Sequence, residues 1–108
     1  MKQVTGVDFE SEVLGSKEPV LVDFFTDGCS PCKMMAPVLQ EIERESNGQL
    51  KVIKVDAAAE AELAASYGVR AVPAFYAFSN GKCVGQTVGA KSKASMKKWF
   101  DDSVCGGS

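Results

Sequence analysis

The chain has 108 residues, of which 45% are hydrophobic and 24% are charged, and its formal net charge is -2. This length suits a single domain with a modest core, and the composition is that of neither a disordered nor a membrane protein. A net charge so close to zero supplies no basic field for nucleic acid or for an anionic membrane, so we expect neither as a partner.

The N-terminus, MKQVTGVDFESE, lacks the apolar segment of a secretory signal, and no apolar run approaches the length of a bilayer span. We therefore expect a cytoplasmic protein. The chain contains no histidine, which excludes Ser-His and Cys-His catalytic sites and every zinc site that includes histidine. Four cysteines in a chain of this kind do not predict a disulfide framework.

In the first part of the chain, short strands and helices alternate. A strand is expected around residues 3–5, and Asp8 can cap a helix over residues 9–15 that ends at a glycine. The run VLVDFF at residues 20–25 is apolar and rich in β-branched and aromatic residues. Such a run predicts a central strand that is buried on both faces and therefore parallel to a neighbour.

A long helix is expected to follow, with its end at the SNG of residues 46–48. Pro37 lies inside this helix and should kink it, because proline removes one backbone hydrogen bond. Met34 is interpreted as ordinary helix packing. The apolar residues that recur at helical spacing are Met35, Val38, Leu39 and Ile42.

The last part of the chain predicts a different order of elements. A strand at residues 50–56 and a helix at residues 59–68 precede two strand-like runs around Asn80-Gly81, which is a favoured two-residue hairpin turn. A closing helix begins at Ser92, and its core side is marked by Met96, Trp99 and Phe100. This order predicts a mixed sheet covered by helices on both faces.

Cys29 and Cys32 fall between the expected central strand and the long helix, at an edge where open α/β sheets bind and react. Residues three apart in a first helical turn have Cβ atoms roughly 5–6 Å apart, so the two sulfurs can form a disulfide. The N–H groups and dipole of the helix start would stabilise a thiolate, and Pro31 suits the first helical position. Cys29 is then the exposed, activated sulfur and Cys32 the shielded, resolving one.

A CxxC pair can also be half of a zinc site or a purely structural disulfide. A zinc site would need two further ligands, and the remaining cysteines, Cys83 and Cys105, do not form a second CxxC. A purely structural disulfide would close a very small loop and constrain little. Redox chemistry is therefore the favoured interpretation, and no catalytic role is assigned to Cys83 or Cys105.

The segments VLVDFFTDGCSPCKMMAPVLQEI, YGVRAVPAF, NGK and VGAKSK resemble the thioredoxin family from about Val4 to Val104. The resemblance implies a thioredoxin fold of about five strands and four helices in one domain, residues 1–104, followed by a flexible tail at 105–108. It implies a Cys29–Cys32 redox disulfide in a protein that reduces protein disulfides through a mixed disulfide. A CxxC near a βαβ pattern is itself a known signal for such chemistry.

Further residue roles follow from the resemblance, and the sequence adds a reason for Asp23. It lies in a run that should be buried on both faces, where a carboxyl group has a raised pKa unless it reaches water at the strand end. Asp23 matches the buried aspartate beneath the disulfide, Lys54 its neighbouring lysine, and Pro73 the cis-proline that faces the CxxC. Alternation along its strand does not settle which face Lys54 occupies, and base rates alone would make Pro73 trans. The substrate-binding surface implied by the resemblance consists of Gly28, Ser30, Pro31, Val72 and Gly89.

The chain also departs from the family's usual Trp-Cys-Gly-Pro-Cys motif, because Gly28 stands for the tryptophan and Ser30 for the glycine. Phe25 stands for another common tryptophan. The resemblance implies a monomer that binds no cofactor or metal itself and is reduced by a flavin- or ferredoxin-linked thioredoxin reductase. Two alternatives stay open at this point, namely a thioredoxin-fold oxidase or isomerase and a non-catalytic binding subunit.

Overall fold

Strand β2 (Val20–Phe25) lies at the centre of a five-stranded sheet in the computed structural model, which describes residues 1–106. All six of its side chains are buried, as the apolar run predicts. β2 pairs in parallel with β3 and antiparallel with β4, so the sheet is mixed. The order of strands is β1-β3-β2-β4-β5, with β1 at Lys2–Gln3, β3 at Lys51–Asp56, β4 at Ala74–Ser79 and β5 at Lys82–Val88.

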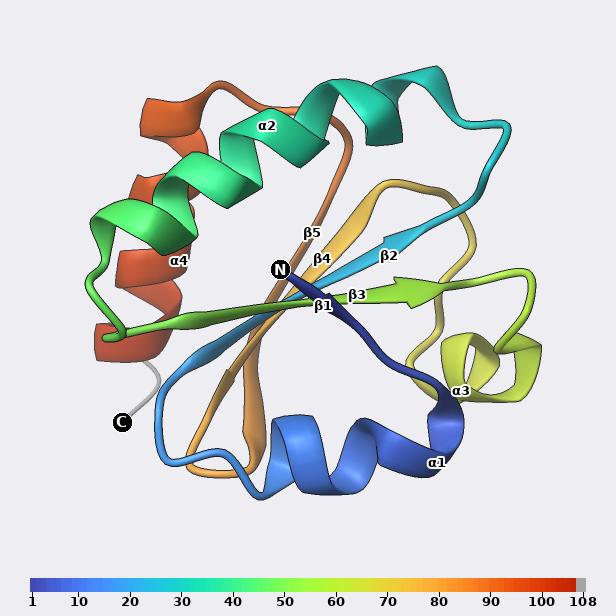
Figure 1. Cartoon of the computed structure of the whole chain (residues 1–108), viewed down its shortest axis with the longest axis horizontal. Helices are drawn as coiled ribbons and strands as arrows, with labels where there is room; N and C mark the ends of the chain where they lie inside the picture. The colour runs from blue at the N-terminus through green and yellow to red at the C-terminus, as the bar shows by residue number, and fades with distance from the viewer. Residues whose placement is uncertain (107–108) are drawn as a thin grey trace.

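Helices cover both faces of this sheet, which confirms the predicted thioredoxin fold (Figure 1). The apolar cluster on one face includes Met35 and Leu39 of α2 together with Met96 and Phe100 of α4. The cluster on the other face holds residues of α1, η1 and α3. The helices are α1 at Gly6–Phe9, its π-helical continuation η1 at Glu10–Leu14, α2 at Ser30–Glu45, α3 at Ala61–Ser66 and α4 at Lys93–Gly106.

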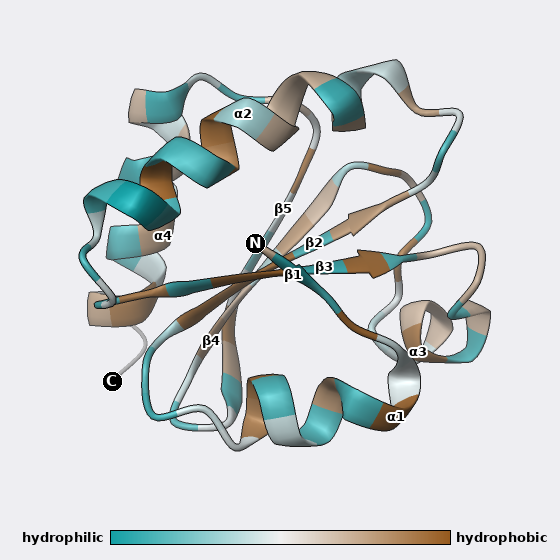
Figure 2. Ribbon diagram, viewed as in Figure 1, coloured by the Kyte–Doolittle hydropathy of each residue, from teal (hydrophilic) through white to brown (hydrophobic). Residues whose placement is uncertain are grey.

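Helix α2 shows the amphipathic pattern that the sequence predicts, with hydrophilic residues alternating with hydrophobic ones in Figure 2. Pro37 lies inside the helix, as expected. The prediction for Met34 is wrong, because 68% of this residue is exposed whereas its neighbour Met35 is buried. Only Met35 has the phase of Leu39, which also packs on the sheet.

The N-terminal helix differs from the prediction in its start and its geometry. It begins at Gly6, with Thr5 rather than Asp8 at the cap position and no side-chain capping bond. Asp8 instead lies in the first turn, where a carboxylate interacts favourably with the helix dipole. The π-helical stretch of η1 gives no periodic signal that distinguishes it from an α-helix over so few residues.

At the other end of the chain, Ser92 caps α4 by accepting a hydrogen bond from the backbone of Ser95 at 3.1 Å. Met96 and Phe100 are buried, and Trp99 is partly buried against the same cluster. α4 includes Cys105 and Gly106, which were expected to belong to a flexible tail. The remainder of that expected tail, residues 107–108, lies outside the described residues.

The hairpin between β4 and β5 has the turn that Asn80-Gly81 predicts, since both residues have positive φ angles, 54° and 79°. Gly85 in β5 is constrained for another reason. A Cβ atom built there would lie 2.7 Å from Cβ of Ser103 on α4, so the missing side chain lets helix and strand approach closely. The closing helix therefore depends on a glycine in the strand beneath it.

We expect Gly85→Ala to lower the free energy of unfolding by about 1–3 kcal/mol, because the added methyl group must displace α4. Urea denaturation followed by circular dichroism measures the loss. Gly28→Ala is the matched control, since a Cβ at Gly28 meets nothing within 4 Å. An equal loss in both variants would contradict the packing explanation.

Candidate active site

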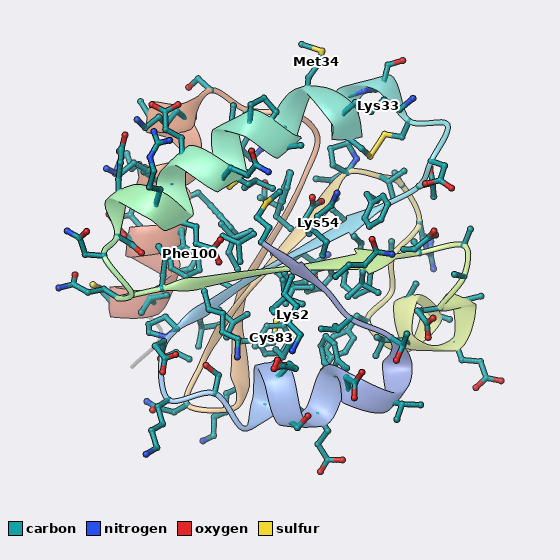
Figure 3. All side chains as sticks on the ribbon, viewed as in Figure 1. Lys2, Lys33, Met34, Lys54, Cys83 and Phe100 are labelled. Atoms are coloured by element: carbon teal, nitrogen blue, oxygen red, sulfur yellow. A yellow bond between two sulfur atoms is a disulfide. The ribbon has the colours of Figure 1, made fainter. Side chains whose placement is uncertain are left out.

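Cys29 and Cys32 are joined by a disulfide at the point where β2 ends and α2 begins (Figure 3). Their Cα atoms are 5.2 Å apart. Cys29 is the cap residue of α2, and its Sγ accepts a hydrogen bond from the backbone N–H of Cys32 at 3.1 Å. A thiolate on Cys29 would receive this hydrogen bond and the positive end of the helix dipole, and both stabilise a negative charge on the sulfur.

The two sulfurs differ in their access to solvent. Cys29 is half-buried, whereas only 5% of Cys32 is exposed. Ser30 is the first helical residue and Pro31 the second, one position later than predicted. This position still suits proline, because the first four N–H groups of a helix have no partner within it. The geometry thus presents one sulfur to a large substrate and shields the other.

The segment before β4 faces the exposed sulfur. The Val72–Pro73 peptide bond is cis, as the family resemblance implies, and Pro73 is buried. The carbonyl oxygen of Val72 lies 3.8 Å from Sγ of Cys29. Gly89 has a φ of 97°, and its N–H donates to the carbonyl oxygen of Pro73 at 2.8 Å. Val72, Pro73 and Gly89 are therefore brought together beside Cys29.

Asp23 lies on β2 and is the one buried charged residue among residues 1–106. It is 1% exposed, and neither of its carboxyl oxygens accepts a hydrogen bond from a described residue. Burial raises the pKa of this carboxyl group from 3.8 to about 7, although the nearby Lys54 acts in the opposite direction. A carboxyl group with this pKa can accept or donate a proton near neutral pH.

Lys54 on β3 is the direct register partner of Asp23 on β2, so both side chains project from the same face of the sheet. This is the face covered by α2, since it also carries Leu21 and Val52. Nζ of Lys54 lies 4.3 Å from the centre of the Phe25 ring, which is a cation–π contact. The structure thereby settles the orientation that alternation along one strand left open.

A pocket of about 220 Å³ opens beside the buried sulfur. Cys32 and Lys54 both line this pocket, whereas Val72 and Pro73 do not. Sequence reasoning missed this pocket and the contact of Phe25 with Lys54. Pairing the two strands in parallel register would have placed Lys54 beside Asp23 in advance. The pocket is lined by Phe25, Thr26, Asp27, Cys32, Lys33, Ala36 and Lys54.

The remaining cysteines take no part in the site, because Cys83 on β5 and Cys105 on α4 are both exposed elsewhere on the surface. Within residues 1–106, no group of three or more cysteine, aspartate or glutamate side chains is arranged to hold a metal ion. In the same part of the chain, every helix is too short or too polar to cross a membrane.

Comparison with known proteins gives a consistent result. The sequence model of the Thioredoxin family matches residues 1–102. The chain is 38% identical to Thioredoxin C-2 of Corynebacterium nephridii over 100 residues, 93% of each chain. It is 42% identical to Thioredoxin 1 of Nostoc sp. over 99 residues, 92% of each chain. It is also 43% identical to the bifunctional thioredoxin reductase/thioredoxin of Mycobacterium leprae over 102 residues, 94% of this chain and 22% of that protein.

We expect Asp23→Asn to be more stable than the parent at high pH. In the folded parent the pKa of Asp23 is about 7, above its ordinary value of 3.8. The free energy of unfolding of the parent therefore falls as pH rises from 3.8 to about 7, and it stays at the lower value above this pH. The advantage of Asp23→Asn should therefore grow by up to about 4 kcal/mol between pH 3 and pH 8.

Urea denaturation at several pH values measures this difference. The Asp101→Asn variant, which removes an exposed carboxylate of α4, controls for the loss of one charge. If stability of the parent and of Asp23→Asn changed with pH in parallel, the carboxyl group of Asp23 would not carry the raised pKa.

Proposed function

The chain belongs to the thioredoxin family and is a thiol–disulfide oxidoreductase, and we propose that it works as a reductant of protein disulfides with Cys29 as its nucleophile. The observation that carries this proposal is the unequal exposure of the two sulfurs at the start of α2. Only Cys29 is accessible to a substrate, and it receives the N–H of Cys32. Its thiolate is therefore both stabilised and exposed.

In the first step, the Cys29 thiolate attacks one sulfur of a substrate disulfide. The substrate S–S bond breaks, a mixed disulfide with Cys29 forms, and the other substrate sulfur leaves as a thiolate that takes a proton from solvent. Cys32 stays protonated during this attack, because it is buried and because the negative charge of the neighbouring Cys29 thiolate disfavours a second thiolate.

In the second step, Cys32 loses its proton to the carboxylate of Asp23, directly or through water. The Cys32 thiolate attacks Sγ of Cys29, the mixed disulfide breaks, and the second substrate sulfur leaves as a thiolate that is protonated. Two electrons have then passed from the dithiol to the substrate, and Cys29–Cys32 is oxidised. Lys54 supports this step because its positive charge favours the ionised form of Asp23.

The proposed substrate surface has two rims, one on each side of Cys29. Gly28, Ser30 and Pro31 form one rim, and Val72 and Gly89 form the other across the sulfur. Backbone groups dominate the second rim, so an extended substrate segment can bind there with little dependence on its sequence. A Cβ at Gly28 would meet nothing within 4 Å, which leaves the first rim open beside the nucleophile.

The dithiol must be regenerated by a partner, since the chain itself contributes only the two sulfurs to electron transfer. A relative whose name joins thioredoxin reductase and thioredoxin supports such a partner. We propose a flavin- or ferredoxin-linked thioredoxin reductase for this role. We also propose that the protein is a monomer and that it works in the cytoplasm, a compartment in which reductases keep thiols reduced.

The role of each cysteine can be tested by replacing them singly in a Cys83→Ser, Cys105→Ser background. Cys29→Ser should abolish the reduction of insulin by dithiothreitol above the uncatalysed rate. Cys32→Ser should retain the first attack and accumulate mixed disulfides with substrate, which mass spectrometry detects. Equal trapping by both variants would contradict the assignment of Cys29 as the nucleophile.

The role of Asp23 predicts a specific kinetic defect. In the parent, resolution of the mixed disulfide should accelerate as pH rises through about 7, because Asp23 then becomes a base. Asp23→Asn should lose this acceleration and slow resolution more than the first attack. Stopped-flow traces of both steps between pH 5.5 and pH 8.5, in steps of roughly half a unit around the raised pKa, provide the measurement. A larger effect on the first attack would show that Asp23 is not the base for Cys32.

A further inference from the structure

The connection between β5 and α4 has two backbone anchors. The first is the hydrogen bond from the N–H of Gly89 to Pro73. The second is a hydrogen bond to a side chain, in which the N–H of Lys91 donates to Sδ of Met35 on α2 at 3.3 Å. No backbone carbonyl of the described residues accepts from Lys91. A methionine sulfur is thus the partner of a backbone donor next to the active site.

Met35 is 1% exposed and lies three residues after Cys32, among the apolar residues under α2. Leucine would fill the same space at small cost, so packing alone does not require methionine here. A thioether differs from a hydrocarbon in that it can accept a hydrogen bond, although weakly. Without the sulfur, a partly buried N–H would lose its partner, which is unfavourable.

This hydrogen bond links two parts of the active site, α2 and the segment that contains Gly89 and Lys91. α2 carries the reactive disulfide, whereas Gly89 and Lys91 belong to the segment attached to Pro73. A substrate bound at Cys29 would lie between these two sides. Among the described residues, the hydrogen bond from Lys91 to Met35 joins the segment directly to α2. The other polar links nearby are the ion pairs of Lys93, the first residue of α4, with Glu41 and Glu45 of α2, and these are partly exposed. Pairs of that kind contribute little.

We propose that Met35 is a positioning residue whose sulfur holds the Gly89–Lys91 segment at a set distance from the helix that carries Cys29 and Cys32. This inference rests on the proposed function, because it assumes that protein substrates contact Gly89. Loss of the sulfur should weaken binding of protein substrates. It should leave the reactivity of the thiols toward small disulfides unchanged, since those do not reach across the segment.

Met35→Leu tests the proposal, and Met96→Leu is the matched control. Met96 is 0% exposed and packs in the same apolar cluster, but its sulfur has no hydrogen bond among the described residues. Both substitutions conserve volume, so both variants should fold, and they differ in that only Met35→Leu loses a hydrogen bond. Selenomethionine-labelled parent protein adds a conservative replacement that keeps an acceptor at the same position.

Two readouts are needed. Amide hydrogen exchange at Lys91 should be about three- to tenfold faster in Met35→Leu than in the parent, and unchanged in Met96→Leu and in the selenomethionine protein. The KM for insulin should rise about threefold or more in Met35→Leu with kcat within about twofold, since one hydrogen bond that positions the segment is lost. Reduction of hydroxyethyl disulfide should be unchanged.

Unchanged exchange at Lys91, or an equal rise of KM in Met96→Leu, would overturn the positioning role while leaving the proposed function intact. If the parent itself did not reduce insulin, the proposed function would fail, and the substrate-positioning role of Met35 with it. The exchange measurement separates these two results, because it reports the hydrogen bond whether or not the protein is active.

Discussion

Strand β2 is buried along its whole length, and the active site depends on this constraint. A strand with neighbours on both edges and helices over both faces can change direction only beyond its end. A turn at residues 27–28 leads from there to Cys29, the cap residue of α2. The same burial places Asp23, two residues before the end of the strand, beneath that helix. The exposed sulfur, the shielded sulfur and the raised pKa therefore follow from one buried strand.

Burial of Asp23 lowers the stability of the folded protein but raises the pKa of the carboxyl group to the range in which it can act as a base. An ionised carboxylate without a hydrogen-bonding partner is unfavourable inside a protein, and the pKa of about 7 expresses this cost. Lys54 reduces the cost only in part. Its ammonium group also contacts the ring of Phe25 and borders the pocket beside Cys32. A closer ion pair would stabilise the charged form further and move the pKa away from neutrality, where a base for a thiol is most useful.

The sequence correctly predicts the features that depend on local patterns of residues. It does not predict the features that depend on contacts between segments far apart in the chain. Apolar runs and turn residues place β2, α2 and the Asn80-Gly81 hairpin correctly. The burial of Met35 agrees with the helical spacing that it shares with Leu39, and Met34, which lacks that spacing, is exposed, so here the local pattern is sufficient and the interpretation of Met34 is wrong. The contacts of Lys54 with Phe25 and of Lys91 with Met35 join different elements, and no spacing along the chain reports them. The roles proposed for Asp23 and Pro73 came from family resemblance, since base rates favour a trans Pro73.

Gly28 affects the surface that the protein offers to substrates, although the fold does not require a glycine at this position. Glycine is required where φ is positive or where a side chain would collide, and neither condition holds at Gly28, in contrast to Gly89 and Gly85. Its presence is therefore not explained by the fold. What it changes is the surface beside Cys29, where an apolar ring would offer contact area to a partner and glycine offers none. On the substrate surface proposed above, recognition then depends more on the opposite rim, formed by Val72 and Gly89, and so on the contacts that hold that rim in place.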